Sequence, residues 1–376
     1  VKALIHNGGN MWQIAGQNFS QYEIPKGSGI MALFTSALWL GGVDINGQLK
    51  LAAVRYRDGQ DYWPGPLSDG DAEVSPATCT QYDQHYVISQ DEVREFDAWF
   101  NAGIFDADNG TNTQSEDFPG YEIPLSILDW PAHGDPALGQ DFYLAPFYDR
   151  NADGIYNVTD GDYPWYDINK DLNCTSDRTV TLYGDQTVWW VMNDKGNIHT
   201  ETGGDPLGME IRSQAFAFAT NDEINNMTFY NYELVNRSTQ TLYDTYFGVF
   251  IDAALGNPFD DYVGCDVSRG LAYCYNGNAV DNPSGGWKGY GANPPAAGID
   301  FFEGPYQDDD GLDNPLVENY NTAKNEKGIP YAGLGIGFGD GIVDNERIGM
   351  HRFLYYNNTG GGGAAQTDPQ TAQDYY

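Results

Sequence analysis

The chain has 376 residues, enough for two or three domains that each bury a hydrophobic core. Its 54 Asp and Glu residues against 18 Lys and Arg residues give a formal net charge of -36, which repels nucleic acid phosphates and anionic lipid head groups. We therefore expect no nucleic acid partner, and no membrane insertion, because no run of 18 apolar residues occurs. Aromatic residues make up 14% of the chain, which predicts a folded protein because disordered acidic chains contain few of them.

The first predicted element is a β-hairpin within residues 37–59. The pair Asn46 and Gly47 lies between stretches of alternating apolar residues. Asn-Gly is the strongest short-range hairpin signal, because a type I′ turn needs positive φ at both central positions. We expect a half-buried antiparallel hairpin in which Leu49 and Leu51 share one face.

One short helix is expected near residues 90–102. Ser89 and Glu92 form a capping box, and apolar residues follow at helical spacing as far as Gly103. Beyond it, residues 104–175 are dominated by Asp, Asn, Gly, Pro and Tyr, which predicts a long loop without regular structure. Such a long loop in a compact protein is usually functional or is held by a structural link.

From Thr179 the pattern changes to short strands separated by polar turns. In the segment "MTFYNYELVN", alternation places Tyr230, Tyr232 and Leu234 on the core face. Strands with turn signals about every ten residues are typical of a β-sandwich. The predicted fold is therefore mainly β, with immunoglobulin-like or jelly-roll-like β-sandwich domains and long calcium-stabilised loops.

The expected domains follow these changes in composition. Residues 1–178 form an N-terminal β-rich domain with an acidic calcium loop, and residues 179–358 form a β-sandwich domain. Residues 359–376 begin with a glycine-rich run and read as a flexible linker that leads to a further domain.

The most specific chemical signal is the segment "DRNADGIYNVTDGD", which has oxygen-bearing side chains at alternate positions around a glycine. Calcium needs six to eight oxygen ligands, and a curled loop with this spacing supplies them. The candidate ligands are Asp149, Asn151, Asp153, the backbone carbonyl of Ile155, Asn157, Asp160 and Asp162. The spacing resembles the calcium loops of dockerins and thrombospondin type 3 repeats. Pro164 bars the helix that would continue a dockerin, so only calcium ligation is carried over from this resemblance.

Weaker acidic fragments follow the same logic. Asp167, Asn169 and Asp171 repeat the alternate spacing without the glycine. A further fragment, "QDDDGLDN", contains Asp308, Asp310 and Asp313, and "GDGIVDNE" contains Asp340 and Asp344. The plainer interpretation of each fragment is a solvated acidic turn. Where calcium binds, we expect a structural role, because millimolar extracellular calcium saturates weak sites.

The four cysteines allow three disulfide pairings. Cys265 and Cys274 lie close together in a strand-rich stretch, so a bridge between neighbouring strands is the preferred pairing, which leaves Cys79 with Cys174. The alternative is four free thiols in a cytosolic protein.

Motifs of catalysis are missing from the sequence. None of the five histidines belongs to an HExxH motif, and no GxSxG elbow, P-loop or GxGxxG follows a strand. No catalytic residue is therefore predicted, and we expect a protein that is not an enzyme. Paired carboxylates for glycoside hydrolysis stay open as an alternative. Core filling is favoured over sugar stacking for Trp189 and Trp190.

Several longer segments carry a resemblance to a known family. They are "ALWLGGVDINGQLKLAAVRYR", "DYWPGPL", "GDQTVWWVMNDKGNIHTETGG", "AFAFATNDEINNMTFYNYELVNRS" and "DDYVGCDVSRGLAYCYNG". Together they resemble large secreted or cell-surface proteins of Bacteroidota that are exported by the type IX secretion system. The resemblance implies an extracellular or cell-surface location, β-domains in series and further sequence beyond Tyr376.

These observations lead to one functional expectation and two alternatives. We expect an extracellular structural or adhesive cell-surface protein, stabilised by calcium, that forms part of a fibre or surface layer. Its partners would be further copies of the chain, other surface proteins or glycans. The alternatives are a glycan-binding module, in which clustered Tyr and Trp stack on sugars, and a secreted polysaccharide hydrolase.

Overall fold

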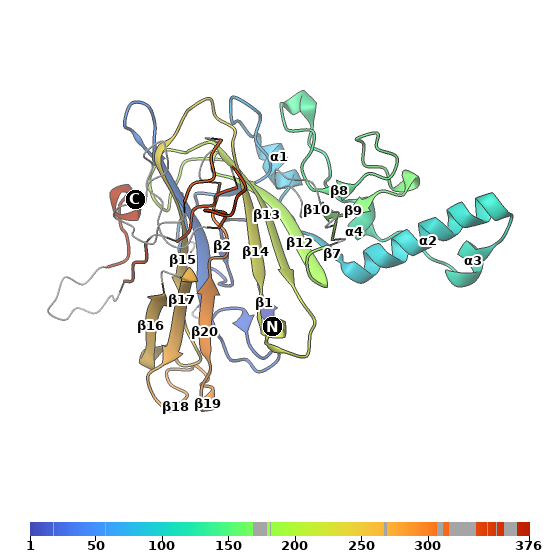
Figure 1. The fold of residues 1–376 in the computed structure, drawn as a ribbon. Helices are drawn as coiled ribbons and strands as arrows, with labels where there is room; N and C mark the ends of the chain where they lie inside the picture. Colours follow the sequence, from blue (N-terminus) through green and yellow to red (C-terminus); the bar gives the residue numbers. More distant parts are fainter. Residues whose placement is uncertain are drawn as a thin grey trace.

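The computed structural model describes most of the chain, and antiparallel strands dominate it (Figure 1). The described residues are 1–17, 19–56, 58–167, 179–180, 182–266, 269–306, 311–315, 336–343, 345–350, 352–356 and 367–376. The fold is mainly β and of the β-sandwich type, as the strand pattern predicts. None of the helices in these ranges is long and apolar enough to cross a lipid bilayer.

The largest sheet has the strand order β14-β13-β12-β6, and β7 also pairs with β12. Its strands are β6 (Trp63–Pro64), β7 (Tyr86–Ser89), β12 (Gln186–Asn193), β13 (Met209–Ala217) and β14 (Phe229–Asn236). Strand β12 is buried on both faces. Because side chains alternate along a strand, Trp189 packs in one hydrophobic cluster and Trp190 in another. Both indoles fill the core, with exposed fractions of 2% and 0%.

A second sheet packs against the first. It has the order β15-β4-β2, with β5 also paired to β4, and comprises β2 (Asn10–Met11), β4 (Thr35–Val43), β5 (Leu49–Ala53) and β15 (Tyr243–Asp252). Leu38 and Leu40 of β4 share one buried cluster with Met192 of β12 and Ile211 of β13. This apolar layer between two sheets defines the sandwich.

A third sheet, of order β16-β17-β20, lies at the end of the molecule away from α2 (Figure 1). Its strands are β16 (Asp261–Asp266), β17 (Leu271–Asn276) and β20 (Ala296–Asp300). Cys274 and Ile299 on its inner face join the hydrophobic cluster that contains Trp190. The short paired strands are β1 (Lys2–Ala3), β3 (Tyr22–Glu23), β8 (Phe147–Tyr148), β9 (Tyr163–Pro164), β10 (Tyr166–Asp167), β11 (Thr179–Val180), β18 (Val280–Asp281) and β19 (Gly291–Ala292).

Both large sheets combine strands from the two sides of residue 178, the boundary predicted between the first two domains. Strand β12 pairs with β6 and β7, and β15 pairs with β4 over eight register positions, Tyr243↔Val43 to Asp252↔Thr35. Residues 367–376 lie within the predicted linker. There α5 (Ala372–Tyr375) places Tyr375 in a cluster with Leu51 and Ala53.

The predicted hairpin is present as β4 and β5, but its turn differs from the type I′ turn expected. Among the two central residues only Gly47 has positive φ, at 74°. The Gly47 amide donates to the Asp44 carbonyl at 2.9 Å, and the Asp44 carboxylate accepts the amides of Asn46 and Gln48. The side chain of Asp44 thus stabilises a longer turn than Asn-Gly alone would form.

The predicted helix is α2 (Gln90–Asn109), and its capping box between Ser89 and Glu92 is confirmed. Its predicted end at Gly103 is wrong, because the helix continues to Gly110, which has φ 68°. At Gly103 the missing side chain makes room for Gln114 of α3 (Thr113–Asp117), whose amide donates to the Trp99 carbonyl at 3.0 Å.

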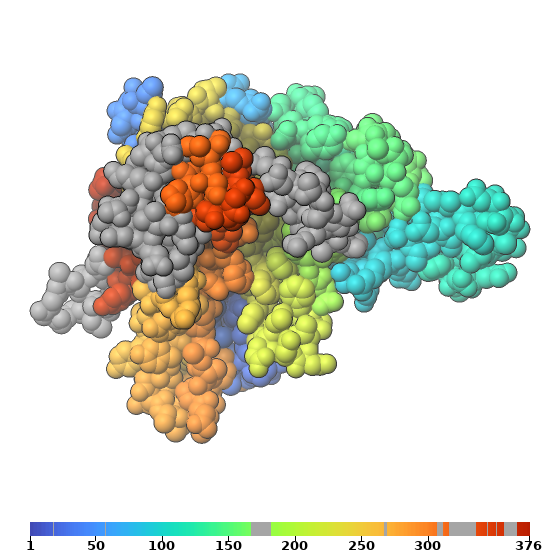
Figure 2. Space-filling view, viewed as in Figure 1, coloured from blue at the N-terminus to red at the C-terminus, as the bar shows by residue number. Residues whose placement is uncertain are grey.

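The expectation that residues 104–175 lack regular structure is also wrong in part. The segment contains the end of α2, α3, α4 (Leu125–Leu128) and the pair β8 and β9. A further helix, α1 (Pro76–Gln81), precedes β7. Helices α2 and α3 form an arm that stands out from the body (Figures 1 and 2). Val93 and Phe96 at the base of α2 pack with Trp189 in one cluster.

Candidate functional site

The predicted calcium loop connects two short strands that pair with each other. Strands β8 and β9 place Phe147 opposite Pro164 and Tyr148 opposite Tyr163. Residues 149–162 therefore begin and end at neighbouring points, and the chain between them must curl. This closed base brings the ends of the acidic segment together.

Side-chain oxygens hold the first half of the loop in the curl that the spacing predicts. The Asp149 carboxylate accepts the amides of Asp153 at 3.3 Å and Gly154 at 2.6 Å, and the Asp153 carboxylate accepts the Ile155 amide at 2.8 Å. Gly154 has φ 80°, and a Cβ there would lie 2.6 Å from the Tyr143 hydroxyl. The positive φ favours glycine at this position, and the missing side chain leaves room for the Tyr143 hydroxyl.

Two amides link the carboxylates across the loop. The Asn151 amide nitrogen lies 3.0 Å from the Asp153 carboxylate and 3.4 Å from that of Asp160. Asn157 donates to the same Asp160 oxygen at 2.7 Å. Two carboxylates thus face one electropositive group, which is the environment that also attracts a cation.

Asp162 closes the loop from its buried side. Its side chain is fully buried and accepts the amides of Arg150 and Asn157, each at 2.9 Å. Burial raises the pKa of Asp162, and the carboxylates of Asp149 and Asp160 raise it further, while the two backbone hydrogen bonds oppose the rise. Repulsion among these carboxylates is the force that a divalent cation would relieve.

The donor set of the loop fits calcium in chemistry, because it consists of carboxylate, amide and backbone oxygens. The Ile155 side chain is 53% exposed, so only its backbone belongs to the curl. Within the part of the chain that the structure describes, however, no group of three or more His, Cys, Asp or Glu side chains gathers as metal ligands do. Calcium binding by this loop stays a prediction.

The structure brings two of the weaker acidic fragments together, which spacing alone did not indicate. The Asp313 carboxylate accepts the amides of Gly339 and Gly341, each at 2.7 Å. Asp340 accepts the Ile342 amide at 2.8 Å. Asp313 therefore links its own turn to the turn at residues 339–341 by hydrogen bonds. Asp167 lies in β10, while Asn169, Asp171, Asp308, Asp310 and Asp344 lie outside the described residues.

The predicted bridge between Cys265 and Cys274 is not formed, and both are free thiols. In the β16–β17 ladder Cys265 lies opposite Ala272 and Cys274 opposite Val263, so the two cysteines are diagonal neighbours. Diagonal Cα atoms are roughly 7–8 Å apart, whereas a disulfide needs about 4.4–6.8 Å. Cys79 is also free, and Cys174 lies outside the described residues.

The thiol of Cys274 lies near two carboxylates, a grouping that the sequence did not indicate. Burial raises the pKa of Cys274 to about 12, and the carboxylates of Asp261 and Asp252 add to the rise. The pKa of Asp261 is itself raised to about 7, mainly by burial. The thiol therefore stays protonated and unreactive at neutral pH.

His199 has a structural position. Its two ring nitrogens lie 2.7 Å from the Leu51 carbonyl and 2.6 Å from the Asp194 carbonyl, and the side chain is buried beside Asp61 at 3.7 Å. Glu201, two residues on, bonds Arg55 at 3.0 Å. Buried polar contacts of His199 thus link its segment, "NIHTETGG", to β5 and to the first residues after β12.

Comparisons with family models, with curated proteins and with solved structures found no match to this chain.

Proposed function

We propose that this chain is an extracellular structural or adhesive cell-surface protein, without enzymatic activity, whose acidic loop binds calcium. In this proposal it forms part of a fibre or surface layer and binds further copies of itself, other surface proteins or glycans. The resemblance to type IX secreted proteins of Bacteroidota supports the location. The negative charge supports a calcium-rich setting, since counter-ions offset repulsion between carboxylates.

Exposed apolar side chains on strands β15, β16 and β17 carry the adhesive part of the proposal. They are at least 37% exposed and comprise Tyr243, Tyr246, Val249, Tyr262, Val263, Tyr273 and Tyr275. Sheet residues that face solvent are usually polar, and clusters of exposed apolar residues mark interaction sites. These strands therefore offer surfaces for association.

A small cavity beside β20 offers a contact point for a bound ligand. Its volume is about 160 Å³. A cavity of this size accommodates the end of a ligand that lies along the surface.

The adhesive proposal is tested with purified chain in calcium buffer, by sedimentation and by binding to cells and extracellular matrix. We expect repeated assembly or adhesion, and weakening of either when Val249 on β15 is replaced by serine. Ile45→Ser is the matched control, because Ile45 is 77% exposed and lies in the hairpin turn. A chain that stays monomeric and binds neither cells nor matrix would contradict the proposal.

A further inference from the structure

The outer face of the sheet β16-β17-β20 gathers tyrosines from two strands. The ladder pairs Tyr262 with Tyr275, and Gly264 with Tyr273. Because side chains alternate, these residues share the face opposite to Cys274, which is buried. Tyr262, Tyr273 and Tyr275 are 60%, 37% and 45% exposed. The third sheet therefore presents an aromatic surface to solvent.

The three rings adjoin one another, with neighbouring planes inclined by 34° at most. The ring centres of Tyr262 and Tyr275 are 5.9 Å apart with planes at 24°, and those of Tyr273 and Tyr275 are 6.2 Å apart with planes at 34°. A tyrosine has only two side-chain torsions, so the rings lose little entropy when a ligand binds. They form one continuous platform, which we call the tyrosine platform.

Two glycines allow the rings to lie along the sheet. A Cβ on Gly264 would lie 2.6 Å from the Tyr273 ring, and a Cβ on Gly277 would lie 2.3 Å from the Tyr262 ring. Each ring thus occupies the space over a glycine. The next strand, β20, adds the small residues Ala296 and Gly298 opposite Tyr275 and Tyr273. No large side chain of β20 therefore stands at these two positions beside the platform.

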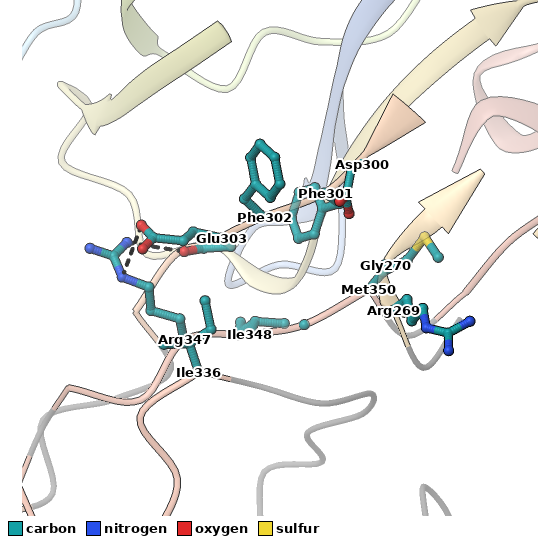
Figure 3. A pocket seen from close by; sticks show the side chains of 12 residues that line it. Arg269, Gly270, Asp300, Phe301, Phe302, Glu303, Ile336, Arg347, Ile348 and Met350 are labelled. Atoms are coloured by element: carbon teal, nitrogen blue, oxygen red, sulfur yellow. Dashed lines mark hydrogen bonds and ion pairs between the residues drawn. The ribbon is translucent and has the colours of Figure 1, made fainter. Parts of the chain in front are cut away.

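Carboxylates flank the platform at one end. Asp266 and Asp300 pair with Leu271 from either side, on the same face as the tyrosines. Asp300 also lines the cavity of about 160 Å³, together with Arg269 and Glu303 (Figure 3). The flat aromatic surface thus leads to a pocket with hydrogen-bonding groups.

The charge of the molecule selects among ligands for this surface. A chain with a net charge of -36 repels nucleic acids and acidic polysaccharides. A neutral sugar chain meets no such barrier. Its apolar ring faces pack on aromatic rings, and its hydroxyl groups donate to carboxylates.

We propose that the tyrosine platform is a binding site for a neutral polysaccharide, with the sugar chain lying over Tyr262, Tyr273 and Tyr275 and its end directed to the pocket at Asp300. This inference rests on the adhesive function proposed above and names its ligand. A basic peptide is the rival occupant, because carboxylates and tyrosine faces also attract cations. The peptide is less favoured because neighbouring carboxylates already have partners: Asp266 pairs with Arg269 at 2.8 Å, and Asp260 accepts the Asn278 amide at 2.7 Å.

Affinity electrophoresis with soluble neutral polysaccharides tests the proposal. The probes are hydroxyethyl cellulose, xylan, laminarin and soluble starch, with polygalacturonate as the anionic probe and polylysine as the basic one. We expect the chain to be retarded by at least one neutral probe and not by polygalacturonate. The double variant Tyr262→Ala and Tyr275→Ala should bind that neutral probe about tenfold more weakly or worse.

Three further variants separate the loss of rings from a loss of folding. Tyr262→Phe with Tyr275→Phe keeps the rings and should retain binding. Ala296→Arg, at an exposed position opposite Tyr275, should obstruct access to the platform with the rings in place. Tyr355→Ala removes a ring that is 58% exposed elsewhere and should bind as the unchanged chain does.

The inference is overturned if no neutral probe retards the chain, or if the double alanine variant binds as tightly as the unchanged chain. Binding of polylysine that needs the tyrosines, without neutral polysaccharide binding, would assign the platform to a basic peptide instead. If the chain assembles or adheres to cells while neutral probes fail to bind, the adhesive function stands and only its assigned ligand is wrong.

Discussion

Buried carboxylates in this protein act as acceptors for backbone amides. Asp194 is fully buried and accepts the amides of Leu207, Gly208 and Met209 at 2.5, 2.9 and 2.7 Å. Asp61 is equally buried and accepts the Ala53 and Glu201 amides. Several converging amides replace the water that a carboxylate loses on burial. Acidic residues therefore hold loops in place inside the molecule as well as giving it a negative surface.

Replacing Asp194 with alanine should lower the free energy of unfolding by on the order of 3 kcal/mol, because buried backbone amides lose their acceptor. Urea unfolding measures the change. Asp91→Ala is the control, since that side chain is 97% exposed, and its effect should be a few tenths of a kcal/mol at most. Equal effects from the two substitutions would contradict this account of Asp194.

Asp261 should make stability depend on pH. Burial raises its pKa to about 7, and the carboxylates of Asp281 and Asp260 add to the rise. In the unfolded chain the group returns to a pKa of about 3.9. The folded state therefore holds the proton more tightly, so this contribution to stability is complete below about pH 4 and is lost as the pH rises through 7.

The substitution Asp261→Asn removes this titration. The free energy of unfolding of the variant, minus that of the unchanged chain, should be larger at about pH 8 than at about pH 5. Urea unfolding of both chains at both pH values measures this difference. The comparison between chains cancels the titration of the other carboxylates. A stability difference that is the same at both pH values would show that Asp261 does not hold its proton in the folded state.

At the scale of elements, the same residue types build both turns and a candidate metal loop. Asp44 shapes the hairpin turn and Asp149 the acidic loop, each by accepting two backbone amides. What distinguishes the acidic loop is that Asp153 and Asp160 both face the Asn151 amide and that Asp162 is buried behind them. Carboxylates are therefore concentrated in this loop, and calcium binding there stays a prediction.

Removing calcium should lower the melting temperature if this loop binds it. We expect EGTA to do so, and Asp153→Ala to reproduce much of the loss with little further effect of EGTA, measured by thermal unfolding. Asp222→Ala is the matched control, because Asp222 also accepts a backbone amide in a short turn but lies outside the loop. Its variant should keep the full response to EGTA. Unchanged melting of the parent chain in EGTA would remove the calcium proposal.

For the whole molecule, the net charge of -36 sets a general repulsion that acts on every element. Adding about 0.5 M NaCl should raise the melting temperature, because salt screens exposed charges beyond a few ångströms. Calcium at equal ionic strength should raise it further, and only the further part should vanish in Asp153→Ala. If NaCl alone gives the entire effect, counter-ion screening explains it and no specific site is needed.

Local patterns predicted those features that neighbouring residues control. The capping box of Ser89 and Glu92 is satisfied within one turn, and the alternation of Tyr230, Tyr232 and Leu234 follows from strand geometry, so all three face the core as predicted. The curl of the acidic loop could also be predicted from the sequence, since Asp149 and Asp153 accept hydrogen bonds from amides only a few residues away.

The sequence by itself determined a folded, acidic, mainly β protein, because charge, aromatic content and alternation are properties of composition and short range. Only the tertiary structure decided that α2 passes Gly103, that Cys265 and Cys274 are diagonal, and that both large sheets join strands from either side of residue 178. It also placed Tyr262 beside Tyr275 on an open face. Each of these depends on the register and packing of segments distant in the chain, which no local pattern specifies.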